Sequence, residues 1–115
     1  VSWLGDVYKR QVQDSPVMLM DEPDSALDFL NRHMVLSKIS ELIKEENKVG
    51  LITLHDPNFA MAYCDRLFML KQGNIVGELD MRAANRDEVQ QKLSLIYGNI
   101  DIVENNGSFL MGRAK

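Results

Sequence analysis

Two adjacent acids, Asp21 and Glu22, directly follow the apolar run at residues 17–20 and precede Pro23. An uninterrupted apolar run predicts a strand that is buried on both faces, as in a parallel sheet. Open α/β sheets bind ligands beyond the carboxyl ends of their strands, so this strand would deliver both acids to a ligand site. Two neighbouring acids there suit a hydrated magnesium ion and a polarised water molecule, which is the chemistry of nucleoside triphosphate hydrolysis.

A second mostly apolar segment, residues 49–54, ends at His55. A helix is predicted between the two strands, and this β-α-β order implies a parallel pair with a right-handed crossover. The carboxyl ends of parallel strands meet at one edge of a sheet. We therefore expect Asp21 and His55 to lie at the same edge.

The intervening helix is predicted by apolar residues at amphipathic spacing: Leu27, Leu30, Met34, Ile39, Leu42 and Ile43. Its start is marked by Ser25-x-x-Asp28, which has the form of an approximate capping box. We expect the helix to end near Glu46.

Turn and cap signals divide the rest of the chain. Asp56 and Pro57 predict the N-cap and first position of a short helix that reaches residue 63. Residues 67–70 and 75–78, and later 100–103 and 109–111, flank turn signals that predict two hairpins, the second at Asn-Gly. Between the hairpins, Asn85-x-x-Glu88 predicts a helix start, and its apolar face would be Val89, Leu93, Ile96 and Tyr97.

Three motifs carry a family resemblance. The run VMLMDEP (residues 17–23) and the following SALD (residues 25–28) resemble the Walker B strand and D-loop of ATP-binding cassette (ABC) ATPases, and LITLHD (residues 51–56) resembles their H-loop. One helix separates the first motif from the last, as in that family. The resemblance implies an α/β fold, the C-terminal part of a P-loop NTPase domain with a mostly parallel sheet plus a small C-terminal helix and hairpin.

The resemblance also implies roles for individual residues, with ATP and Mg²⁺ as cofactors. Asp21 would hold the magnesium ion through coordinated water, and Glu22 would polarise the attacking water. His55 would reach the γ-phosphate, and Asp28 would belong to a D-loop that crosses a dimer interface. An alternative for Asp28 is a purely capping role, and both roles are compatible. His33 has no motif around it and is expected on a solvated helix face.

Composition excludes several other classes of protein. The formal net charge of −4 and a pI near 5.1 give no electrostatic reason to expect nucleic acid binding. The single cysteine, Cys64, excludes an intramolecular disulfide and fits a reducing cytosol. It lies far from both histidines, so no zinc-type ligand cluster is expected. No apolar run approaches the roughly 18 residues of a membrane-spanning helix.

The sequence lacks the G-x-x-x-x-G-K-[ST] phosphate loop and the Leu-Ser-Gly-Gly type signature of the family, and it begins without methionine. We therefore expect residues 12–115 to be the C-terminal portion of an ABC nucleotide-binding domain that does not hydrolyse ATP by itself. Residues 6–11 resemble a translation of the transposon end used in sequencing-library adapters. We interpret residues 1–11 as a non-native segment that contributes little to the core.

The favoured function is the ATPase subunit of an ABC importer. Residues 63–67, together with a compact tail that ends with Ile96-Tyr97-Gly98 and a hairpin, resemble importers of iron–siderophore, haem or cobalamin type. This implies a homodimer or paired ATPase subunit, transmembrane permease subunits, and a cytoplasmic location on the inner face of the membrane. The alternatives are a soluble ABC ATPase of DNA repair, chromosome maintenance or translation, and an inert truncated fragment.

Overall fold

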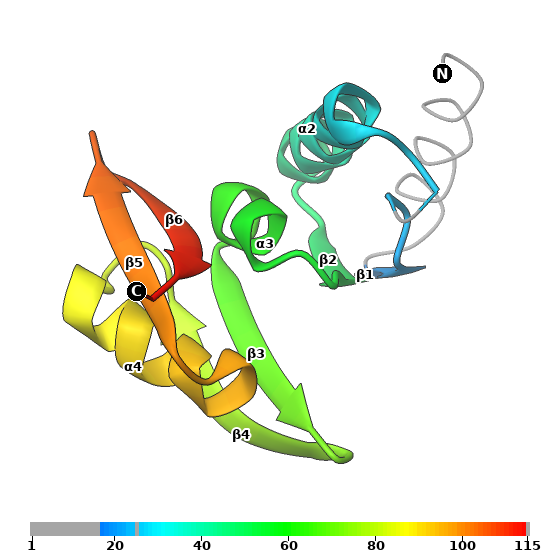
Figure 1. Cartoon of the computed structure of the whole chain (residues 1–115). Coiled ribbons are helices and arrows are strands. Elements are labelled where there is room, and N and C mark those ends of the chain that lie inside the picture. The colour runs from blue at the N-terminus through cyan, green and yellow to red at the C-terminus, as the bar shows by residue number, and fades with distance from the viewer. Residues whose placement is uncertain (1–16, 25, 115) are drawn as a thin grey trace. The chain divides into compact units, whose positions relative to one another are not determined.

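The computed structural model describes residues 17–24 and 26–114, with helices and strands in both halves (Figure 1). The chain divides into two compact units, residues 1–55 and residues 56–115. No helix in the described part of the chain combines the length and the apolar character needed to cross a membrane.

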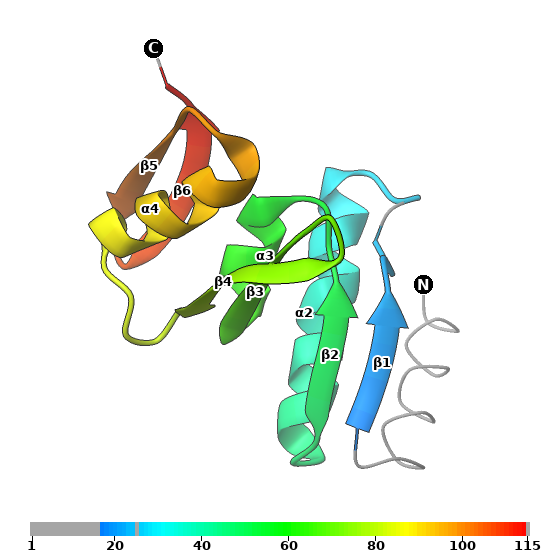
Figure 2. The same ribbon diagram turned by 90° about the horizontal axis from the view of Figure 1, so that it is seen from below.

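The first unit is a β-α-β element made of β1 (Val17–Asp21), α2 (Phe29–Glu45) and β2 (Val49–Thr53). The strands pair in parallel, and the register places the last residue of β1 opposite the last residue of β2. Figure 2 shows the two strands side by side, with α2 running along one face. The predicted parallel pair is therefore confirmed.

Strand β1 is not buried on both faces, so that prediction is wrong. Met18 and Met20 are buried against α2. The alternate apolar residues of the two strands are between 45% and 68% exposed: Val17, Leu19, Val49 and Leu51. Alternate residues of a strand point to opposite faces, and within the described residues one helix covers one face only.

Helix α2 begins later than the sequence predicted, and its buried face differs from the face that the apolar spacing indicated. Its N-cap is Asp28, whose Oδ1 accepts a hydrogen bond of 2.9 Å from the Asn31 N–H. Ser25, the predicted start of the capping box, lies outside the described residues. The buried residues of the helix are Val35, Leu36, Ile39 and Leu42.

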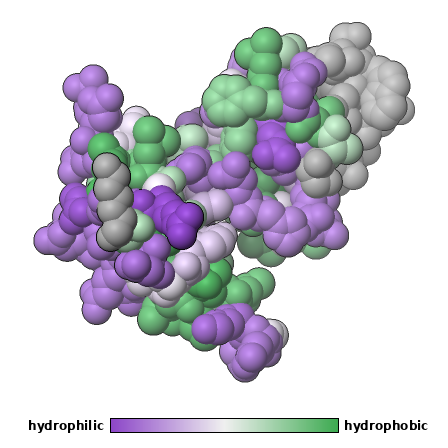
Figure 3. Space-filling model, in the orientation of Figure 1, coloured by the Kyte–Doolittle hydropathy of each residue, from purple (hydrophilic) through white to green (hydrophobic). Residues whose placement is uncertain are grey.

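Two residues of the predicted α2 face are exposed, Leu30 at 68% and Met34 at 46%. The predicted face combined apolar residues from two different sides of the helix. At about 100° of rotation per residue, positions 30 and 34 point away from the buried residues Val35, Leu36, Ile39 and Leu42. Figure 3 shows hydrophobic surface in the region of α2.

The second unit contains two hairpins and two helices. Its elements are α3 (Pro57–Tyr63), β3 (Arg66–Lys71), β4 (Asn74–Asp80), α4 (Arg86–Tyr97), β5 (Ile100–Asn105) and β6 (Ser108–Arg113). Strands β3 and β4 pair antiparallel, as do β5 and β6, which confirms both predicted hairpins. Within the described residues one strand pair is parallel and two are antiparallel.

Both hairpins turn on two residues with positive φ. The angles are 51° at Gln72 and 79° at Gly73, and 52° at Asn106 and 81° at Gly107. Positive φ at both central positions defines the type I′ turn, whose twist matches that of the flanking strands. A glycine in the second position adopts this conformation without a Cβ clash.

The two predicted caps in this unit are confirmed. The Asp56 Oδ1 accepts from the Asn58 N–H at 2.9 Å, and Pro57 is the first residue of α3. The Asn85 Oδ1 accepts from the Glu88 N–H at 2.8 Å at the start of α4. Each cap satisfies a backbone N–H that the first helical turn leaves without a partner.

The core of the second unit joins α4 to both hairpins. Its buried residues are Met61, Leu67, Met69, Leu79, Val89, Leu93, Ile100 and Ile102. Ile96 packs against this core, but Tyr97 is 41% exposed and does not belong to the predicted buried face. Tyr97 is the last residue of α4.

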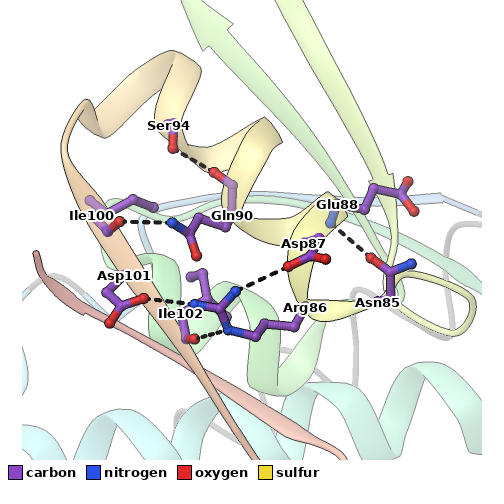
Figure 4. Close-up of polar contacts among 9 residues, drawn as sticks. All are labelled: Asn85, Arg86, Asp87, Glu88, Gln90, Ser94, Ile100, Asp101 and Ile102. Atoms are coloured by element: carbon purple, nitrogen blue, oxygen red, sulfur yellow. Dashed lines mark hydrogen bonds and ion pairs between the residues drawn. The ribbon is translucent and has the colours of Figure 1, made fainter.

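Polar contacts fasten α4 to β5 (Figure 4). The Arg86 Nε donates to the Ile102 carbonyl at 2.7 Å, and its guanidinium also pairs with Asp101 at 2.8 Å. One turn further on, the Gln90 Nε2 donates to the Ile100 carbonyl at 3.4 Å. The helix is therefore held along the strand by backbone acceptors as well as by apolar packing.

Candidate functional site

The candidate site lies at the carboxyl ends of β1 and β2. Asp21 and Thr53 are register partners at the last positions of the two strands. Register partners in a parallel pair present their side chains on the same face. The Thr53 hydroxyl donates a hydrogen bond of 2.5 Å to the Asp21 Oδ1. The first predicted acid is thus oriented by the neighbouring strand.

The hydrogen bonding between β1 and β2 extends one residue further, to Glu22, and the chain turns at this residue. Its backbone N–H donates to both acceptors of Thr53, the carbonyl at 3.1 Å and the hydroxyl at 3.0 Å. Its φ of 44° is left-handed, which is uncommon and strained for a residue with a side chain. Such strained conformations cluster at functional sites, where the surrounding structure enforces them.

The side chains of Glu22 and His55 meet at the same edge. The His55 Nε2 contacts the Glu22 Oε1 directly. The His55 side chain is 86% exposed and that of Glu22 is 34% exposed. The structure therefore brings Asp21, Glu22 and His55 together at one end of the parallel pair, while their chemical roles stay predictions.

Asp28 does not join this group of contacts among the described residues. Its carboxylate accepts the Asn31 N–H at the start of α2. The capping alternative therefore has direct structural support. The D-loop role at a dimer interface stays a prediction, and the two roles are compatible because an exposed cap can also meet a partner.

The loop between β1 and α2 contains Asp24, a residue that the sequence reading did not single out. It is the one buried charged residue in the described part of the chain, with 4% of its surface exposed. Its carboxylate lies 4.0 Å from the Arg32 Nε, and its carbonyl accepts from the Leu27 N–H. Arg32 also donates to the Leu27 carbonyl at 3.0 Å. These contacts fix the loop that follows the two acids.

Thr53 is the second residue that the sequence reading missed. Its only signal was a hydroxyl in a mostly apolar segment, two positions before His55. Threonine is common in strands for its β-branched shape alone. The contact with Asp21 depends on the register of β1 against β2, which the sequence did not supply.

Two further sequence predictions concern His33 and Cys64. His33 is half-buried and stacks edge-on against Phe29, with ring centroids 4.6 Å apart, so it is not a fully solvated residue. Burial, and then the charge of Asp65, raise the pKa of the Cys64 thiol above its ordinary value. A thiol that stays protonated is a poor nucleophile.

The donors at the site suit magnesium that arrives with a nucleotide. Within residues 17–24 and 26–114, no cluster of three or more His, Cys, Asp or Glu side chains could hold a metal ion. Mg²⁺ prefers oxygen ligands and is commonly bound by one or two carboxylates together with phosphate oxygens and water. The exposed Asp21 carboxylate fits that use.

Comparison with known proteins gives a consistent family. No family model matches the chain. The hemin import ATP-binding protein HmuV of Vibrio vulnificus is 34% identical over 88 residues, covering 76% of this chain and 33% of the relative. The phosphonates import ATP-binding protein PhnC 3 of Nostoc sp. is 36% identical over 95 residues, covering 83% and 35%.

A solved structure of a metal-chelate type ABC transporter in an inward-facing conformation matches the fold with a TM-score of 0.63 and 25% identity. The match covers 84% of this chain and 39% of that one. The chain spans about a third of the length of the curated relatives that it matches. Sequence and fold together show that the chain belongs to the ATP-binding proteins of ABC transporters.

Proposed function

We propose that the full-length protein is the ATPase subunit of an ABC importer and that this chain carries its Walker B, D-loop and H-loop segments. The observation that supports this most is the contact between Glu22 and His55 beside Asp21 at the ends of two parallel strands. Hydrolysis of ATP needs an acid that positions water and a group that reaches the γ-phosphate from the same side.

Each residue has one task in this proposal. Mg²⁺·ATP, when bound, supplies the phosphoryl group and neutralises the charge that develops on it. Asp21 holds the metal through coordinated water. Glu22 accepts a hydrogen bond from the attacking water and polarises it. His55 reaches the γ-phosphate and, through its contact with Glu22, keeps that carboxylate in place.

The transported substrate is proposed from the relatives. One relative is named for hemin import and another for phosphonates import. Among these, haem agrees with the iron–siderophore, haem or cobalamin type that the sequence resembles. The partners would be a second ATPase subunit and transmembrane permease subunits, on the cytoplasmic face of the membrane. No contact of the described residues favours the soluble DNA-repair or translation alternative.

The isolated chain is proposed to be inactive. It spans about a third of its relatives, and the phosphate loop that clamps ATP is not in its sequence. The exposed apolar side of β1 and β2 also supports a larger domain, because such a face is normally covered in a parallel sheet. Residues 12–115 would thus be the C-terminal portion of the domain. Residues 1–11 lie outside the described residues, and their non-native origin stays a proposal.

The test is Glu22→Gln in the full-length ATPase. The amide keeps the shape of the side chain but removes the charge that polarises water. We expect ATP binding to survive and hydrolysis to fall at least about 10²-fold, the lower end of what a positioned acid or base contributes. The two subunits should then stay closed around ATP, and size exclusion should detect an ATP-stabilised dimer.

Two histidine variants complete the experiment. His55→Ala should slow turnover while sparing ATP binding, because the contact with Glu22 is lost. His33→Ala is the matched control, and it should leave turnover unchanged because its ring packs against Phe29. Hydrolysis by Glu22→Gln at the parent rate would show that another group positions the water.

A further inference from the structure

We propose that Thr53 is a positioning residue that sets the orientation of both acids of the site. This inference rests on the proposed function. Its basis is a single side chain on β2 that contacts Asp21 and Glu22 at once. Neither contact follows from the motifs, because Thr53 lies outside the residues that resemblance assigns a role.

The direction of each hydrogen bond is determined by chemistry. A threonine hydroxyl has one proton to donate and two lone pairs to accept with. A carboxylate oxygen accepts, so the hydroxyl proton points to the Asp21 Oδ1, 2.5 Å away. The Glu22 N–H can only donate, so it uses an oxygen lone pair of the same hydroxyl at 3.0 Å.

This arrangement leaves one side of Asp21 for a ligand. The Oδ1 is occupied by Thr53, while the Oδ2 has no hydrogen-bond or ion-pair partner among the described residues. Mg²⁺ demands near-ideal octahedral geometry, so a carboxylate that serves it gains from a fixed orientation. Groups that orient metal ligands from behind typically contribute 10- to 100-fold to metal affinity or activity.

Thr53 also supports the strained turn at Glu22. The left-handed φ of 44° is held by two hydrogen bonds from the Glu22 N–H, both to Thr53. That turn carries the Glu22 side chain to its contact with His55. Without the hydroxyl, one of these two bonds remains, and the carboxylate direction is less firmly set.

The experiment compares Thr53→Val and Thr53→Ser in the full-length ATPase. Valine keeps the β-branched shape and the backbone carbonyl but has no hydroxyl, whereas serine keeps the hydroxyl. We expect Thr53→Val to weaken Mn²⁺ binding to the ATP complex about tenfold, measured by electron paramagnetic resonance with Mn²⁺ in place of Mg²⁺. ATP affinity without metal should be unchanged. In turnover, kcat should fall while KM for ATP stays within about twofold.

The serine variant distinguishes a positioning role of Thr53 from a purely structural one. Thr53→Ser should return Mn²⁺ affinity and kcat to within about threefold of the parent, because a hydroxyl is again present. The control is Ser37→Ala, which removes an exposed hydroxyl from α2 and should change neither quantity. Parent-like Mn²⁺ affinity in Thr53→Val would overturn the inference, and so would a loss that serine does not restore.

Failure of the proposed function gives a different pattern. A parent protein that binds Mn²⁺ and ATP but does not hydrolyse ATP would contradict the ATPase proposal. The ratio of Mn²⁺ affinities between parent, valine and serine variants would still decide the role of Thr53, because that measurement does not depend on turnover.

Discussion

At the scale of single residues, Asp28 combines an observed local role with a proposed one at an interface. It caps α2 through the Asn31 N–H at 2.9 Å, and it is exposed to solvent. A cap needs an acceptor atom and no charge, so asparagine serves nearly as well as aspartate. A contact across a dimer interface would respond to the charge itself. The two roles can therefore be separated by substitution.

We expect Asp28→Ala to lower the free energy of unfolding by about 1 kcal/mol, the usual cost of a lost N-cap, while Asp28→Asn changes it by only a few tenths. Urea unfolding measures both. Glu41→Ala, at an exposed position of the same helix, is the control and should have little effect. If Asp28→Asn keeps stability but weakens the ATP-stabilised dimer, the interface role is supported. Equal stability of all variants would contradict the cap.

At the scale of elements, two polar side chains of α4 make hydrogen bonds to β5, and these bonds differ in length and strength. Arg86 makes a short, charge-assisted bond to the Ile102 carbonyl, whereas Gln90 makes a long bond to the Ile100 carbonyl. The Gln90 Oε1 is buried without a partner among the described residues. A buried oxygen without a hydrogen-bond partner lowers the stability of the folded state. This cost offsets much of the stabilisation from the hydrogen bond of the Gln90 amide nitrogen.

Replacing each residue by methionine tests this difference. Arg86→Met should lower the free energy of unfolding by about 1–2 kcal/mol, because a hydrogen bond from a charged donor is lost, and its half-exposed ion pair with Asp101 adds little. Gln90→Met should be neutral within about 0.5 kcal/mol or slightly stabilising, since removing the amide also removes the orphaned oxygen. Thermal unfolding followed by circular dichroism compares the two. A larger loss for Gln90→Met than for Arg86→Met would contradict the structure.

At the scale of the whole molecule, the most consequential feature is the exposed apolar side of β1 and β2. Leu19 and Leu51 are register partners and are 68% and 55% exposed. Contiguous exposed apolar surface marks interaction sites or aggregation liabilities. In the proposed full-length domain, further elements would cover this face. The isolated chain and the full-length protein should therefore respond oppositely to charge placed there.

The substitution pair Leu19→Lys and Leu51→Glu tests this difference. In the isolated chain, opposite charges on register partners stay solvated, so we expect less concentration-dependent association in light scattering and a change in unfolding free energy within about 0.5 kcal/mol. In the full-length protein the same pair would be buried, and we expect a loss of about 3 kcal/mol or more. A full-length protein that tolerates the pair would show that nothing covers this face.

The amino-acid sequence by itself determined the local features of this protein. The Asp56-Pro57 and Asn85 caps and the Asn106-Gly107 turn were predictable because each depends on contacts within a few residues. The order of strand, helix and strand was enough for the parallel pair, since a helical connection returns the chain to the starting end of the sheet before the second strand begins. The motifs at residues 17–28 and 51–56 were enough for the family.

Tertiary structure alone decided which faces are buried and which side chains meet. Apolar runs show that a strand can be buried, but coverage depends on other elements, and among the described residues α2 alone covers the β1–β2 pair. The buried side of α2 is decided by its packing against Met18 and Met20 of β1. The contact of Thr53 with Asp21 requires the register between strands that lie more than thirty residues apart in the chain. Such contacts are long-range in sequence, so no local pattern encodes them.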